Sequence, residues 1–398
     1  MDIGCVLQVK FSLTFANSKL DNSASRFSSI LPKFTLFLSK VCINNRIKMI
    51  NHSQFGNQTN HSQFINQTLI SWYNIRLSIS INIFSFIGIV LNSILCVTIF
   101  NKRNLQQPHS RLMANLALSD MIFCILLSVK ATLPVIFNNQ RYSNTSISIN
   151  TGTLVCKTVS FFEMLTVGSS MLTLAAIGIE RYRAIIYPLN GSLSKYHLKI
   201  FLPATWAFSA IAAAFYVIDR NYYYNILDCT GAFTSSGNSR KAVFTAVFAS
   251  IVVFTPLLII LICYACIAVK LCRKTLPMDE SDYKIQAARI EQKKTVCIVT
   301  LMCMTVISAM TFCPFIIFYL WISFSKISDP NFFKGQNYLY WKLLQAFTII
   351  LLIPCILNPL LYNIASSNFR KEIKQLLKSL RWRMCHRSIA PKTRNPIC

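Results

Sequence analysis

The sequence predicts an all-α membrane protein: a seven-transmembrane helix bundle with a C-terminal amphipathic helix. The chain of 398 residues is 54% hydrophobic and only 13% charged, whereas a soluble domain carries about 25% charged residues. Seven apolar stretches each have the roughly 20 residues that a helix needs to cross a bilayer. Helices are predicted because these runs do not alternate with a period of two and because lipid offers the backbone no other partner. The stretches are 77–100, 112–136, 154–179, 199–218, 242–269, 295–322 and 343–364.

The distribution of basic residues predicts the orientation. The formal net charge is +27. The loops after the first, third and fifth stretches hold fourteen Lys and Arg residues, and the opposite loops hold seven. Because cytoplasmic loops carry the excess, the N-terminus is expected outside the cell and the C-terminus in the cytoplasm of a multi-pass plasma-membrane protein. A nucleic-acid partner is not expected, because a soluble nucleic-acid binder would not need seven apolar stretches.

The residues before the first stretch are expected to form an extracellular tail, 1–76. A tandem repeat, NHSQFGNQT followed by NHSQFINQT, lies within 49–70 and is interpreted as a solvated, glycosylated segment. We interpret 1–48 as an upstream extension, with Met49 as the natural start. The bundle is then 77–364, and 365–398 is a cytoplasmic helix and tail. Acceptor patterns for N-glycosylation occur on the predicted outer side at Asn51, Asn57, Asn60, Asn66 and Asn144.

The cysteines and histidines do not point to catalysis. Most of the 15 cysteines lie in apolar runs, where they behave as small apolar side chains. The five histidines lie outside those runs and do not cluster. We therefore expect no metal site of the zinc type and no enzyme built on a serine–histidine pair.

Polar residues inside the apolar stretches are the main functional signal, because burying them in lipid is costly. The first stretch holds Asn92, the second holds Asn115 and Asp120, and the seventh holds the segment NPLLY at 358–362. Asp120 lies about midway along its helix and needs a cation or hydrogen-bond donors there. The alternative is that each residue only makes a polar contact between helices.

These residues belong to an ordered set of landmarks. The third stretch ends in ERYRAIIYPL, and each remaining stretch carries one or two more marks. Residues 77–380 thereby resemble the rhodopsin-like (class A) G-protein-coupled receptors. The further marks are Cys156, Trp206, Pro256, Tyr264 and Pro314.

The resemblance implies an activation mechanism and a heterotrimeric G protein as partner. Glu180 would hold Arg181 in the resting state, and activation would release it to the G protein with Tyr264 and Tyr362 turning inward. The alternative is an ordinary interfacial ion pair. The residues implied in coupling and activation are Glu180, Arg181, Tyr182, Tyr264, Pro314, Asn358, Pro359 and Tyr362.

The resemblance also implies a disulfide and a sodium pocket. Cys156 would pair with Cys229. The sodium pocket would consist of Asp120, Asn92, Ser170 and Asn358, with no other cofactor. The chain departs from the family at Pro354 and Cys355, where polar residues are common, so the alternative is that the sodium site is not retained. It also departs at Phe312, which stands where many members have tryptophan.

The ligand is expected to be an amine or a peptide. Glu163 lies seven residues after Cys156, about 10 Å deeper at 1.5 Å per residue. Amine receptors carry an aspartate there, so Glu163 is a candidate anchor for a cation. Lys130 lies at a comparable depth on the neighbouring helix, and an intramembrane ion pair is the alternative. The expected pocket walls are Lys130, Glu163, Phe248, Phe312, Phe315 and Thr348.

After the seventh stretch, apolar residues at three- and four-residue spacing predict an amphipathic helix on the inner leaflet, with Cys385 as a candidate palmitoylation site. They are Phe369, Ile373, Leu376, Leu377 and Leu380. The function expected is a receptor that converts ligand binding into G-protein activation. The alternatives are a seven-helix binding protein that does not signal, and a transporter, which would show inverted repeats.

Overall fold

The structure is a computed structural model that describes seven stretches of the chain and some isolated residues. The stretches are 59–102, 107–140, 149–187, 194–217, 246–273, 302–325 and 346–375, without positions 309, 319 and 323, and side chains are described from residue 75 onward. The chain divides into two units, Met1–Ile70 and Ser71–Cys398. Every contact given below lies within the second unit.

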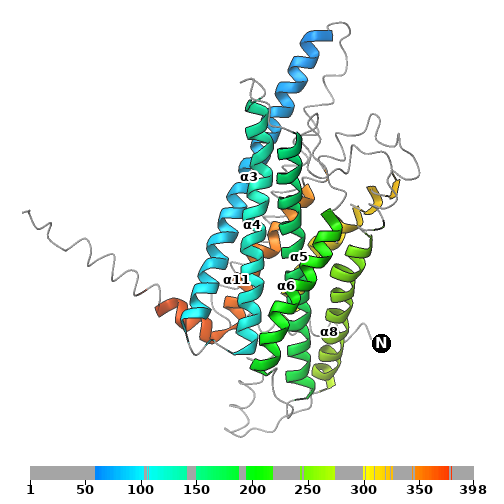
Figure 1. Cartoon of the computed structure of the whole chain (residues 1–398). Helices are drawn as coiled ribbons and strands as arrows, with labels where there is room; N and C mark the ends of the chain where they lie inside the picture. The colour runs from blue at the N-terminus through cyan, green and yellow to red at the C-terminus, as the bar shows by residue number, and fades with distance from the viewer. Residues whose placement is uncertain are drawn as a thin grey trace, which may run out of the picture. The chain divides into compact units, whose positions relative to one another are not determined.

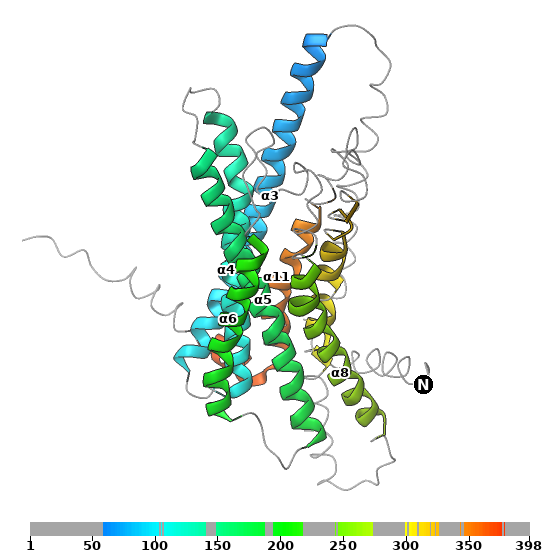
Figure 2. The same cartoon turned by 45° about the vertical axis from the view of Figure 1, so that its right-hand side comes forward.

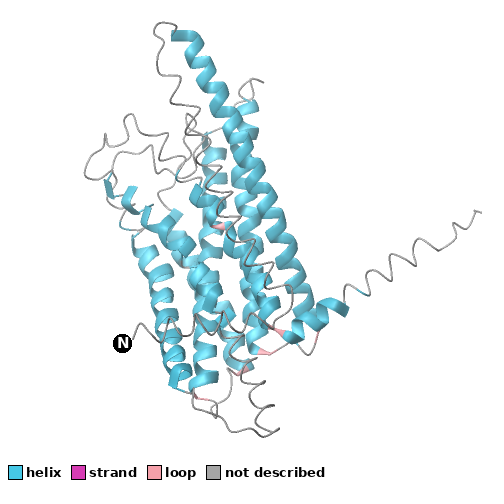
Figure 3. Ribbon diagram, turned by 180° about the vertical axis from the view of Figure 1, so that it is seen from behind, coloured by secondary structure: helices cyan, strands magenta, loops and turns pink. Residues whose placement is uncertain are grey.

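Seven helices are long and apolar enough to cross a membrane, so the predicted number of spans is confirmed. Every regular element in the part of the chain that the structure describes is helical (Figure 3). The elements are α3 (Thr59–Asn101), α4 (Pro108–Gln140), α5 (Ile149–Ile186), α6 (Lys195–Val217), the π-helix η3 (Ala249–Phe254), α8 (Thr255–Arg273) and α11 (Leu352–Ala365). The sixth and seventh spans are Met302–Ile322 and Ala346–Ala365.

Helix α3 begins at Thr59, whereas the first helix was predicted to begin at residue 77. The second copy of the repeat is therefore helical, although a solvated tail was expected there. The physical reason is that residues 59–76 contain neither glycine nor proline. Adding a residue to an existing helix is far easier than nucleating a new one, so the span extends backward through polar residues. The apolar part alone, Ile75–Asn101, is the candidate span.

Helix α5 is the central helix of the second unit. It contacts α4, α6, η3 and α8, and Figures 1 and 2 show it between them. In the apolar 18-residue stretch of α5, 83% is buried inside the protein, whereas only 17% of the corresponding stretch of α6 is buried. Helix α6 instead exposes large apolar side chains, among them Ile211 at 61%. An exposed apolar face of this kind is expected where lipid covers the protein.

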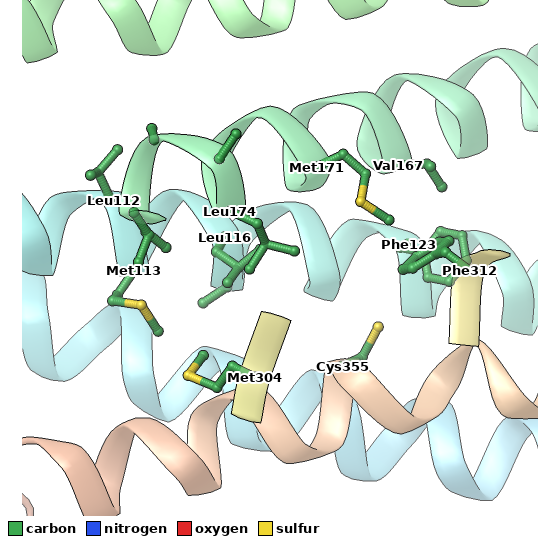
Figure 4. Close-up of a cluster of buried hydrophobic side chains, with 14 of the residues drawn as sticks. Leu112, Met113, Leu116, Phe123, Val167, Met171, Leu174, Met304, Phe312 and Cys355 are labelled. Atoms are coloured by element: carbon green, nitrogen blue, oxygen red, sulfur yellow. The ribbon is translucent and has the colours of Figure 1, made fainter. Parts of the chain in front are cut away.

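Among the described residues, the interior holds one large apolar cluster to which several spans contribute and a smaller one of Met164, Ala213, Phe248 and Val252. Figure 4 shows Leu112 and Leu116 of α4 beside Leu174 of α5, with Met304 and Cys355 close by. Because the lipid outside is as apolar as these side chains, their burial gains little from leaving water. Close packing and polar contacts between helices must therefore stabilise the bundle.

One such polar contact joins α3 and α4 near the predicted outer face. Asn82 donates from Nδ2 to Thr132 Oγ1 at 3.2 Å. Ser128 Oγ donates to Asn82 Oδ1. The amide thus uses both its donor and its acceptor on the neighbouring helix, which fixes the two helices in register.

Pro256 explains the π-helix that precedes it. A proline has no N–H, so the carbonyl of Val252 loses its helical donor. The chain responds with one wide turn, η3, in which Thr255 donates from both its N–H and its Oγ1 to the oxygen of Ser250; the Oγ1 bond is 2.8 Å. A wide turn beside a proline shifts the register of α8 against α5.

The C-terminal end of α5 is held by a lysine from another helix. Lys270 of α8 donates from Nζ to the carbonyl oxygens of Ile185 at 2.8 Å and Ile186 at 3.0 Å. The last carbonyls of a helix lack intrahelical donors and carry partial negative charge. A cation from α8 therefore joins the predicted cytoplasmic ends of the third and fifth spans.

A further helix over residues 367–375 follows α11. Ser366 accepts a hydrogen bond from the N–H of Phe369 at 3.2 Å, which is the geometry of an N-cap. Arg370 donates to the oxygens of Asn363, at 3.0 Å, and Ile364. A capped start and a cation on the last carbonyls of α11 make a sharp corner between the two helices.

Phe369 does not face the membrane as the amphipathic pattern predicted. It is 2% exposed and packs on the ring of Tyr362, with 5.0 Å between ring centroids. A salt bridge of 3.0 Å between Lys102 and Glu372 ties the same helix to the end of α3. Ile373 of the same predicted set is half-buried and packs against the core. Leu376, Leu377, Leu380 and Cys385 lie outside the described side chains.

We expect Gly168→Ala to destabilise the bundle. A Cβ at Gly168 would lie 2.7 Å from Ser209 Oγ, 2.9 Å from Ser209 Cβ and 3.1 Å from Val252 Cγ1. Forcing a methyl group into such a contact costs about 1–3 kcal/mol. The measurement is thermal unfolding of the receptor purified in detergent.

Gly178→Ala on the same helix is the matched control. Its nearest neighbour would be Ile260 Cγ1 at 3.8 Å, an ordinary contact. Its melting temperature should stay unchanged or rise, because alanine favours a helix over glycine by about 0.5–1 kcal/mol. Equal melting temperatures of the two variants would refute the close-approach role of Gly168.

Candidate functional site

The predicted outer half of the bundle contains an ion pair between α4 and α5. Lys130 Nζ lies 2.7 Å from Glu163 Oε2 and 3.0 Å from Oε1. The side chain of Glu163 is 6% exposed and that of Lys130 is 29% exposed. Both carboxylate oxygens accept from one ammonium group, so the structure has the ion pair that was the alternative to a cation anchor.

The other predicted pocket residues lie on three helices around this level. Phe248 is buried and packs on the ring of Tyr216, with 5.3 Å between centroids. Phe312 is 6% exposed and lies beside Phe123, with 6.5 Å between centroids (Figure 4). Phe315 and Thr348 are half-buried.

Asp120 lies deeper, 5% exposed, and accepts hydrogen bonds from two other helices. Ser170 Oγ on α5 donates to Oδ1 at 3.2 Å, and Asn358 Nδ2 on α11 donates to Oδ2 at 2.9 Å. Three of the four residues of the expected sodium pocket are thus in contact. The carboxylate joins the second, third and seventh spans at one point.

Asn92, the fourth residue, binds the backbone instead. Its Nδ2 donates to the oxygens of Gly88 at 2.9 Å and Cys355 at 2.7 Å. The carbonyl of Cys355 needs a donor because Pro359, four residues later, has no N–H to offer. The amide oxygens Oδ1 of Asn92 and Asn358 are buried and have no hydrogen-bond partner among the described residues.

A second polar network joins the second, third and fourth spans. Trp206 donates from Nε1 to Asn115 Oδ1 at 2.9 Å, and Asn115 Nδ2 donates to Thr173 Oγ1 at 2.8 Å. Ser119 Oγ donates to the oxygen of Asn115 at 3.1 Å. This supports the plainer reading of Asn115 as a polar contact between helices.

The predicted cytoplasmic ends of the helices hold the Glu180–Arg181 pair. Arg181 Nε lies 3.1 Å from Glu180 Oε2. Tyr182 lies beside Tyr187, with 6.0 Å between ring centroids. Tyr264 is 5% exposed and belongs to the apolar core, and Pro314 lies within the sixth span.

Tyr362 of NPLLY is 1% exposed and contacts the first turn of α4. Its hydroxyl lies 3.1 Å from Ser110 Oγ, and its ring centroid lies 5.8 Å from that of His109. Sequence reasoning missed His109 and Ser110. The available signal was Pro108, which favours the first position of a helix and so places the next two residues in the first turn.

Some predicted residues lie outside what the structure describes. Cys156 is 1% exposed and disulfide-bonded, but Cys229 falls outside the described residues. So do Asn51, Asn57 and Asn144, and the side chains of Asn60 and Asn66. Within the described residues, no three His, Cys, Asp or Glu side chains gather as a metal site would require.

The structure is thus a seven-helix membrane bundle with a buried carboxylate near its centre and an ion pair towards one end. The chain belongs to the family described as 7 transmembrane receptor (rhodopsin family), whose model matches residues 91–362. The resemblance seen in the sequence is thereby confirmed. The crystal structure of squid rhodopsin has the same fold, with a TM-score of 0.58 and 20% identity over 78% of this chain and 87% of that one.

Similar proteins of known function are receptors named for peptides. The neuropeptide FF receptor 1 of Homo sapiens is 22% identical over 313 residues, 74% of this chain and 68% of the relative. The neuropeptide Y receptor type 2 of Sus scrofa is 26% identical over 294 residues, 72% and 71% of the two chains. The tachykinin-like peptides receptor 86C of Drosophila melanogaster is 23% identical over 306 residues, 73% and 56%.

The exposure of the Lys130–Glu163 pair predicts unequal effects of removing each charge. Lys130→Gln leaves a carboxylate that is 6% exposed without its cation, and breaking a buried pair in this way costs about 3–5 kcal/mol. Glu163→Gln leaves an ammonium that is 29% exposed and in reach of water, so we expect a smaller loss, about 1–2 kcal/mol. The measurement is thermal unfolding in detergent.

The double variant Lys130→Gln with Glu163→Gln is the control. It buries no unpaired charge, so it should be more stable than Lys130→Gln alone. Losses that simply add would show that the two charges do not interact.

Proposed function

We propose that this receptor is activated by an extracellular peptide and passes the signal to a heterotrimeric G protein. The observation that carries the proposal is the pairing of Glu163 with Lys130. An amine ligand would need a carboxylate that is ready to accept its charge, and here both oxygens already accept from Lys130. Displacing the lysine would leave it without its counter-ion, at a cost of several kcal/mol.

A peptide does not depend on that single anchor. It gains affinity from many contacts, so it can leave the ion pair in place and bind along the outer ends of the helices and loops. The relatives named for neuropeptide FF, neuropeptide Y and tachykinin-like peptides support this class. The excess of basic residues on the opposite loops supports an N-terminus outside the cell and a plasma-membrane location.

The proposed binding region lies in the outer half of the bundle. Its walls would be Lys130, Glu163, Phe248, Phe312, Phe315 and Thr348, under a second extracellular loop tied to α5 by Cys156 and Cys229. Phe312 lies beside Phe123, one turn from Asp120 on α4. A ligand that moves the sixth span through Phe312 would therefore disturb the packing next to the central carboxylate.

The proposed coupling region lies at the cytoplasmic ends. Arg181 would leave Glu180 to meet the G protein, while Tyr264 and Tyr362 turn inward beside it. Pro314 in the sixth span and Pro359 in α11 would permit the change, because a proline weakens the helical hydrogen bonding around it. Binding energy from the ligand would shift the population between the two arrangements.

A sodium ion at Asp120 is part of the proposal. Hard cations take oxygen ligands, and the residues here supply a carboxylate, the hydroxyl of Ser170 and two buried amide oxygens without partners, Oδ1 of Asn92 and of Asn358. Many family members have polar residues where this chain has Pro354 and Cys355. These two residues add no side-chain oxygen to the proposed ligands. A bound cation would offset the buried negative charge of the resting state.

The peptide proposal is tested by nucleotide exchange on G proteins in cells that express the receptor. We expect activation by a member of a peptide panel and none by a panel of biogenic amines. Glu163→Gln should change the potency of the peptide less than about tenfold, which is 1.4 kcal/mol. Arg181→Ala should abolish exchange.

Two results would contradict the proposal. An amine that activates the wild type and fails on Glu163→Gln would make Glu163 the cation anchor. A peptide that binds without any exchange would indicate a binding protein that does not signal.

The sodium proposal predicts stabilisation of the purified receptor by NaCl over N-methylglucamine chloride at the same ionic strength. A ligand present at ten times its Kd adds about 1.4 kcal/mol to the stability of the folded state. Asp120→Asn should remove the difference between the salts, because it removes the charge. Equal melting temperatures of the wild type in both salts would refute the site.

A further inference from the structure

His109 lies where two parts of the coupling region meet. It occupies the first turn of α4, directly after Pro108. Its Nδ1 is 3.8 Å from Glu180 Oε2 on α5, and its ring packs on Tyr362 of α11 at 5.8 Å between centroids. Its side chain is 13% exposed and that of Glu180 is 5% exposed. Three helices thus converge on one imidazole ring.

The polar atoms around this ring are not fully satisfied. His109 Nδ1, Glu180 Oε2 and Arg181 Nε are buried, and none has a hydrogen bond of good geometry to any described residue. Leaving a buried polar group unpaired is unfavourable. The two atoms would have to approach by about 0.6 Å, from 3.8 Å to the 3.2 Å upper limit of an N–H···O bond, for Nδ1–H to donate to Glu180.

The next residue connects the same turn to α11 a second time. Ser110 Oγ and the Tyr362 hydroxyl are 3.1 Å apart. The aromatic contact of His109 and the hydrogen bond of Ser110 therefore hold Tyr362 from one side. Nδ1 of the same ring lies 3.8 Å from Glu180 Oε2. His109 is consequently placed to link Glu180 and Tyr362, which do not need to touch each other.

We propose that His109 is a positioning residue of the resting receptor. Its Nδ1–H orients the Glu180 carboxylate toward Arg181, and its ring holds Tyr362 against the start of α4, so that both are released together. The inference rests on the proposed coupling through Arg181 and Tyr362, and adds the residue that makes their movements interdependent. Removing the link raises the population of the active arrangement without ligand.

Two substitutions separate the two contacts of the ring. His109→Phe keeps an aromatic ring against Tyr362 and removes the nitrogen that faces Glu180. His109→Asn removes the ring and keeps a nitrogen donor on Cγ, where the imidazole carries Nδ1. His197→Phe is the matched control, because His197 is exposed in the first turn of α6 and contacts only the ring of Tyr196 among the contacts that the structure shows for it.

The experiment measures ligand-independent nucleotide exchange by receptor in lipid nanodiscs with purified G proteins. We expect His109→Phe to raise the exchange rate about fivefold, the smallest effect in the usual range of coupling energies. His109→Asn should also raise it, because it removes the ring that holds Tyr362, and His197→Phe should equal the wild type. In a Glu180→Gln background, His109→Phe should add nothing. A wild-type rate in His109→Phe, or a full fivefold effect that persists with Glu180→Gln, would overturn the proposal.

A second readout does not depend on signalling. Melting temperatures of the wild type, His109→Phe, Glu180→Gln and the double variant form a double-mutant cycle. The proposal expects the double variant to be no less stable than the less stable single variant. Strict additivity would overturn it. If neither the wild type nor any variant shows exchange above receptor-free discs, the proposed G-protein coupling fails, and this cycle still decides whether His109 and Glu180 interact.

Discussion

The absence of water within the bilayer is the constraint on which the rest of the structure depends. Every polar group that a span carries must find its partner inside the protein. Asp120 takes donors from α5 and α11, and Trp206 donates to Asn115. Asp120 and Trp206 therefore join helices that are far apart in sequence. Since apolar burial gains little in lipid, these few contacts decide which helices become neighbours and in what register.

The prolines in the spans leave backbone carbonyl oxygens that also need a hydrogen-bond donor from within the protein. Pro359 cannot donate to the carbonyl of Cys355, and the amide of Asn92 takes over at 2.7 Å. Pro256 is accommodated within its own helix, because the chain forms the wide turn η3 just before it. In the first case the hydrogen bond runs between the first and seventh spans, and in the second it stays local. A proline thus either ties two helices together or changes the register of one.

These rules explain how much the sequence could predict. Spans follow from hydropathy, and polar residues in them are conspicuous, so Asp120, Glu163 and Glu180 were identified without the structure. Their partners depend on how each helix is rotated about its axis, which composition does not reveal. Hence the sequence did not show that the amide nitrogen of Asn92 binds a carbonyl left open by a proline. Phe369 was assigned to lipid and packs on Tyr362, and His109 was missed because it precedes the apolar run.

The two ion pairs of the bundle differ in a way that suits their proposed roles. Both oxygens of Glu163 accept from Lys130, so that pair is satisfied. Glu180 meets Arg181 through Oε2, and neither that atom nor Arg181 Nε has a well-formed hydrogen bond to a described residue. A fully satisfied buried network is rigid, and a partly satisfied one has less to lose by rearranging. Rearrangement is therefore favoured at the Glu180–Arg181 pair, while the Lys130–Glu163 pair is the more rigid of the two.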